Sequence, residues 1–122
     1  MSAVLSSSVA IANTDLQTKI CANISNAQTE ASSNFRLIKD GVCNLINETS
    51  DEKTKKSLGD ICAASNSDMK ASLRLFLRGA DRIGMPGLDN RQQVILKYIA
   101  ITAIVTEVPE AFNPALQENG CL

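Results

Sequence analysis

The strongest signal for the fold lies in DNRQQVILKYIAITAIVTEV, residues 89–108. Asp89 and Gln92 stand three residues apart, the spacing of a capping box that starts a helix. Beyond them, apolar side chains are spread around the whole helical circumference and leave no polar face, which is typical of a helix inside a protein. We therefore expect a buried central helix here. A bilayer span needs about 20 apolar residues, so the run 94–108 predicts no membrane span.

A long amphipathic helix is predicted in the first half of the chain. Apolar residues recur there at steps of three or four, which is the helical period. Thr14 followed by Gln17 has the spacing of a capping box, and residues 47–50 have the polar composition of a helix end. The apolar positions of this helix are Leu16, Ile20, Ile24, Ala27, Ala31, Phe35, Ile38, Val42 and Leu45.

A second series with the same period follows and stops at the Gly- and Pro-containing residues 84–87. It carries across residues 65–68, where Ser67 or Asp68 could cap a new helix, so one helix or two in line both fit. Its positions are Leu58, Cys62, Ser65, Met69, Leu73, Phe76, Ala80 and Ile83.

These patterns predict an all-α fold: a bundle of two long amphipathic helices and one apolar central helix, with a short helical tail. The boundaries that we expect are an N-terminal arm at 1–13, a helical bundle at 14–108 and a C-terminal tail at 109–122. The arm lacks the basic residues that open a secretory signal. The expected location is therefore cytoplasmic or assembly-associated by default.

Composition limits the function classes that the chain fits. Its 122 residues are 44% hydrophobic and carry a net charge of −1, which suits one soluble domain and gives no bulk attraction to nucleic acid. The chain has no His, the residue most used as a general base and as a transition-metal ligand. It also lacks nucleotide-binding, hydrolase and metalloprotease motifs. We expect no enzymatic activity, no cofactor and no metal site.

The four cysteines, Cys21, Cys43, Cys62 and Cys121, form no CxxC pair. In an antiparallel hairpin that turns near Thr49, Cys62 would lie level with about residue 36. It would then be roughly 10 Å along the helix from Cys43, beyond disulfide reach. That register disfavours a Cys43–Cys62 bond. We expect buried thiols that pack as small hydrophobes, with a disulfide framework left open.

The main polar feature is a cation stripe of four residues spaced four apart on one helical face: Lys70, Arg74, Arg78 and Arg82. Three interpretations stay open: a solvated face, pairing with acids of a neighbouring subunit or helix, and an anionic ligand. Residues 69–97 hold six cations and two anions, whereas 98–122 hold no cation and three acids. Those acids, the expected acidic partner surface, are Glu107, Glu110 and Glu118.

The third helix resembles one helix of the phycobiliproteins, because Leu96, Lys97 and Tyr98 match that family's Leu-Arg-Tyr run. The resemblance implies a helical module that holds a pigment. Since the position of the bilin-bearing Cys is occupied by Leu, no pigment site carries over. Ser33-Asn34 and the terminal Asn119-Gly120 match the family more loosely. The chain departs from the family's pattern at three places: Leu88 replaces that Cys, Asn90-Arg91 replaces Arg-Asp, and Thr106-Glu107 replaces Gly-Asp.

Together these features predict a non-enzymatic helical protein that works by self-association or protein–protein interaction, as a structural or assembly subunit or an adaptor. In a bundle of three helices, the two amphipathic helices do not completely enclose a third that is apolar all round. The arm, the tail or another chain must therefore cover the rest of its apolar surface. We therefore expect a homo-oligomer or a protein partner. The alternative is a ligand-binding module that holds an apolar or pigment-like carboxylated molecule, as in phycobiliprotein light harvesting.

Overall fold

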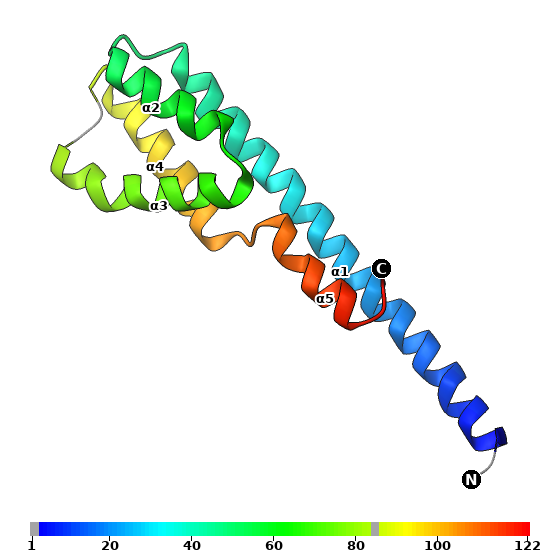
Figure 1. The fold of residues 1–122 in the computed structure, drawn as a ribbon. Coiled ribbons are helices and arrows are strands. Elements are labelled where there is room, and N and C mark those ends of the chain that lie inside the picture. Colours follow the sequence, from blue (N-terminus) through cyan, green and yellow to red (C-terminus); the bar gives the residue numbers. More distant parts are fainter. Residues whose placement is uncertain (1–2, 84–85) are drawn as a thin grey trace. The chain divides into compact units, whose positions relative to one another are not determined.

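The computed structural model describes residues 3–83 and 86–122, with side chains over 14–79 and 86–122. The described residues contain no strand, and the predicted all-α fold is confirmed (Figure 1). Two units divide the chain: Ala31–Val108 forms one, and α1 up to Glu30 forms the other with Pro109–Leu122. The elements are α1 (Ala3–Ile46), α2 (Glu52–Ala63), α3 (Asn66–Ile83), α4 (Asn90–Val105), the 3-10 helix η1 (Pro109–Phe112) and α5 (Asn113–Glu118).

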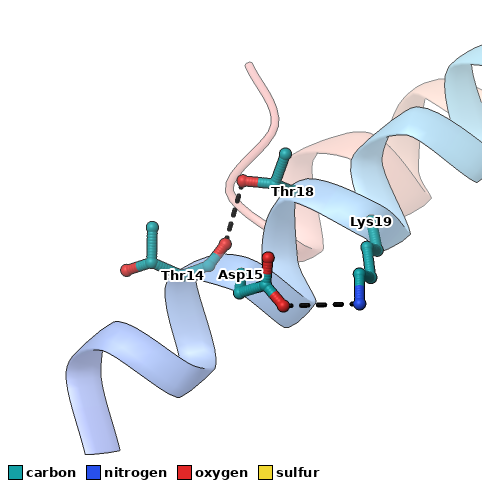
Figure 2. Close-up of polar contacts among 4 residues, drawn as sticks. All are labelled: Thr14, Asp15, Thr18 and Lys19. Carbon is teal, nitrogen blue, oxygen red and sulfur yellow. Dashed lines mark hydrogen bonds and ion pairs between the residues drawn. The ribbon is translucent and has the colours of Figure 1, made fainter. Parts of the chain in front are cut away.

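Helix α1 starts at Ala3 and includes most of the stretch expected to form an arm. The capping box predicted at Thr14 is wrong, because Thr14 lies inside the helix. Its carbonyl oxygen accepts a hydrogen bond from the Thr18 hydroxyl at 2.9 Å. Lys19 Nζ lies 3.4 Å from Asp15 Oδ2 one turn away, and Figure 2 shows both contacts on the exposed helix. Exposed pairs at this spacing stabilise a helix by about 0.3 kcal/mol.

The second helical series is two helices, α2 and α3, and the chain reverses direction between them (Figure 1). Asp51 caps α2, since its carboxylate accepts hydrogen bonds from the backbone N–H and the hydroxyl of Thr54, both at 3.0 Å. The hydrogen bond from the Thr54 backbone N–H, and to a smaller extent the one from its hydroxyl, lowers the pKa of Asp51. Ser65 Oγ accepts from the Asp68 N–H at 3.3 Å, so Ser65 takes the capping place that we assigned to Ser67 or Asp68.

The core of the Ala31–Val108 unit is contributed by all four of its helices, with α4 packed on α3. Helices α1 and α4 approach closely at Gly41, where an added Cβ would lie 2.8 Å from Ile99 Cδ1. The capping box of α4 is confirmed: Asp89 accepts from the Gln92 N–H at 2.8 Å, and the Gln92 side chain accepts from the Asp89 N–H at 2.9 Å. The largest fully buried side chains are Phe35, Val42, Leu58, Met69, Leu73 and Leu96.

The expectation of free thiols is wrong, because the structure pairs all four cysteines. Cys43 and Cys62 are bonded with their Cα atoms 5.2 Å apart, within the range for disulfides. Our register placed α1 beside one long antiparallel helix. In the structure α2 starts only at Glu52 and is short, so the last turn of α1 meets the last turn of α2. Cys62 therefore lies level with Cys43 and not with residue 36, and the prediction that disfavoured this bond is wrong.

The second disulfide, Cys21–Cys121, lies in the other unit and joins the C-terminal segment to α1, with a Cα–Cα distance of 5.6 Å. Side-chain amides of α1 support the same attachment. Gln28 Nε2 donates to the Pro109 carbonyl and to Asn113 Oδ1, each at 2.9 Å. Gln17 Nε2 donates to the Asn119 carbonyl at 2.7 Å. The segment is thus held by polar side chains and one covalent bond.

Candidate interaction surface

Helix α4 presents an apolar face to solvent. Five large side chains on this face have exposed fractions from 41% to 77%, the largest belonging to Val105. They follow the helical period, which places them on one side of the helix. We define the α4 face as Val94, Ile95, Tyr98, Ile101 and Val105.

The expectation that this helix is buried at the centre of the bundle is therefore wrong for one side of it. Its opposite side is fully buried, through Leu96, Ala100 and Ala103. The hydrophobic character continues around the helix, but the described chain covers only the side that packs on the core. The prediction that the helices of this chain would leave part of it uncovered agrees with these exposures.

A groove of about 350 Å³ runs between α1 and α4 beside this face. Its wall from α1 includes the side chain of Leu37, which is exposed like its neighbour Tyr98 on α4. No charged side chain lines it, so contacts inside it are mainly apolar. The lining residues are Asn34, Leu37, Ile38, Ile95, Tyr98, Ile99 and Thr102.

The four cations of the stripe do not behave alike. Lys70 is partly buried, and its Nζ donates to the Thr106 carbonyl at 2.9 Å. Thr106 is the C-cap of α4, where a cation also meets the negative end of the helix dipole. Arg74 and Arg78 are exposed and form no ion pair with the described residues. The side chain of Arg82 lies outside the described residues.

The three acids of the expected partner surface are exposed but belong to different units. Glu107 follows α4 within the Ala31–Val108 unit. Glu110 lies in η1 and Glu118 ends α5, both in the other unit. Of the stripe residues whose side chains the structure describes, Lys70, Arg74 and Arg78, none lines the groove, so these cations and the groove do not form one ligand site.

Replacing Lys70 by Met should lower the stability of the fold. The Met side chain keeps most of the apolar stem but removes the hydrogen bond and the charge at the C-terminus of α4. We expect the free energy of unfolding to fall by about 1 kcal/mol in urea titrations. Arg74→Met is the matched control and should change it by less than about 0.5 kcal/mol. Equal losses in the two variants would contradict the capping role of Lys70.

No protein-family model, curated protein or solved structure matches this chain. The resemblance to phycobiliproteins therefore stays a prediction. Within the described residues, no helix combines the length and apolar character needed to cross a bilayer. The same residues contain no group of three or more acidic or cysteine side chains placed to hold a metal ion.

Proposed function

We propose that this protein acts by self-association, as a subunit of an assembly or an adaptor, and that the α4 face is its contact surface. The observation that carries the proposal is the exposure of five large apolar side chains on one helical face, with Tyr98 exposed to 67%. Single exposed apolar side chains are common on soluble proteins, whereas several that lie together on one face mark an interaction site. Tyr98 lies at the centre of this face, and Tyr is enriched among the residues that carry most of the binding energy in protein–protein interfaces.

The proposed role is non-enzymatic. A sequence without His offers few groups for acid–base catalysis near neutral pH. The α4 face has no ionisable group except the Tyr98 phenol, and the groove beside it has no charged lining residue. Shape and apolar contact are what this surface can offer to a partner.

Introducing a charge at the centre of the α4 face tests the proposal. Tyr98→Lys would place an ammonium group in a desolvated interface, and we expect the dissociation constant of the oligomer to rise roughly tenfold or more. The measurement is mass from light scattering, across a dilution series that starts at high micromolar concentration. Circular dichroism would verify that the helical content is unchanged.

The matched control is Leu75→Lys on α3, because Leu75 is exposed to 66%, almost the same as Tyr98, but lies on another helix. It should leave the mass at each concentration unchanged. A wild-type chain that is strictly monomeric at high micromolar concentration would contradict self-association. If Leu75→Lys dissociated the oligomer and Tyr98→Lys did not, the contact surface would lie on α3.

A second candidate function is the binding of a small apolar molecule in the groove. Its volume of about 350 Å³ lies at the lower end of the range for ligand pockets, about 300–1,000 Å³. Tyr98, which belongs to the phycobiliprotein resemblance, is among its lining residues. The lining provides no cation for a ligand carboxylate. An absorption spectrum of the natively purified protein tests for a bound pigment. Absorption bands at longer wavelengths than those of the protein itself would favour this candidate.

We also propose an oxidising compartment for the mature protein, in place of the cytoplasmic default. The support is the pairing of all four cysteines in two disulfides. Such bonds persist outside the reducing cytosol, on secreted, periplasmic and surface proteins. Thiol titration of the native protein under denaturing conditions should find no free thiol.

A further inference from the structure

Resting on the proposed self-association, we propose that a second copy docks antiparallel on the α4 face, related to the first by a two-fold axis. In this arrangement Val94 lies level with Val105 of the second copy, and Tyr98 with Ile101 of the second copy. Arg91 then lies beside Glu107 of the second copy, and symmetry forms this ion pair twice. The occupant of the surface is thus the same helix of another copy, in a defined direction and register.

The spacing of the α4 face supports the direction. Its central row is Val94, Tyr98, Ile101 and Val105, with steps of four, three and four. This order of steps is the same when the helix is read backwards. A two-fold axis between Tyr98 and Ile101 therefore superposes the row on itself. A closed dimer with the same patch on both copies requires such self-complementarity.

The charges at the two ends of α4 support the same direction. Arg91 lies three residues before Val94, and Glu107 lies two residues after Val105. Both side chains are exposed and form no ion pair with the described residues. An antiparallel pair of helices brings each Arg91 to a Glu107, whereas a parallel pair would place like charges together. Like-charge contacts disfavour the wrong arrangement and fix register.

Charge reversal and charge exchange test this register. Arg91→Glu alone and Glu107→Arg alone each create two like-charge contacts in the dimer, and each should raise the dissociation constant roughly tenfold at low salt. The double variant restores two opposite-charge pairs in exchanged order and should return to within about twofold of wild type. The constants come from sedimentation or light scattering over a dilution series.

The folded monomer should tolerate both changes. Glu at position 91 lies in the first turn of α4, and Arg at position 107 follows its last turn, both favourable positions for the helix dipole. Weaker association of the single variants would therefore not reflect a damaged helix. Arg74→Glu, on an exposed part of α3, is the control for a change of net charge and should leave the constant unchanged.

The outcomes separate the two proposals. A wild-type chain that stays monomeric contradicts self-association itself. Two results would overturn the antiparallel register and leave self-association standing. In one, the wild type dimerises and the single variants have its dissociation constant. In the other, the double variant is weakened by the two single effects combined. Recovery by the double variant, together with an unaffected Arg74→Glu, supports the register.

Discussion

Replacing Cys21 and Cys121 by serine is expected to release the C-terminal segment 109–122 from α1 and to leave the Ala31–Val108 unit folded. The segment contains only η1 and the short helix α5, with six residues in Asn113–Glu118. Helices of that length do not form alone in water. Its buried side chains are Pro109 and Leu116, so little apolar contact remains once the covalent bond is removed.

The expected size of the effect follows from loop closure. A disulfide that closes a loop of 100 residues stabilises the native state by about 4–5 kcal/mol in the chain-entropy description. While the Ala31–Val108 unit stays folded, only the loop residues outside it, 22–30 and 109–120, gain freedom when the bond is absent. The free energy that protects the amides of the segment from hydrogen exchange should then fall by about 3 kcal/mol. Amide hydrogen exchange measures this directly at residues 113–118.

The control for this variant is the pair Cys43→Ser with Cys62→Ser. That bond closes a separation of 19 residues inside the other unit, so its loss should weaken α2 and spare residues 113–118. Unchanged exchange at 113–118 in the Cys21 and Cys121 variant would show that the hydrogen bonds of Gln17 and Gln28 hold the segment without the disulfide.

The second large effect is expected from Leu96→Ala. Leu96 is fully buried on the inner side of α4 and belongs to the core shared with α1 and α3. The truncation removes apolar contact and leaves a cavity, which costs about 2–5 kcal/mol in buried sites of this kind. The free energy of unfolding from urea titration should fall by that amount.

The matched control is Leu75→Ala, the same chemical change at a side chain exposed to 66%. It should cost less than about 0.5 kcal/mol. A cost for Leu96→Ala equal to that of Leu75→Ala would show that the inner side of α4 is not packed as described. Measuring both in the Tyr98→Lys background removes the contribution of association.

Local sequence patterns were sufficient for the parts of the fold that depend on local chemistry. The helical period of the first series and the Asp89–Gln92 capping box predicted α1 and the start of α4. These signals act within a few residues, so no tertiary information is needed to find them. The start of α1 escaped them, because the cap at Thr14 was only a spacing coincidence.

Properties that depend on the packing of distant segments could not be predicted in this way. The absence of a polar face on α4 indicated that its whole circumference contacts apolar groups. Only the packing of the other helices shows which side of α4 this chain itself covers. The pairing of Cys43 with Cys62 depends on how the 47–51 connection directs α2. Lys70 fitted the cation stripe by its spacing, while its acceptor, the Thr106 carbonyl, lies 36 residues away.

The division of the chain sets an order of assembly during synthesis. The Ala31–Val108 unit is contiguous, but the other unit needs both ends of the chain. Cys43 and Cys62 leave the ribosome close together, whereas Cys21 must wait 100 residues for Cys121, roughly 5–20 s at translation rates. During that interval Cys21 is an unpaired thiol near two others. Closure of the Cys43–Cys62 bond within that interval would leave Cys121 as the one cysteine available to Cys21.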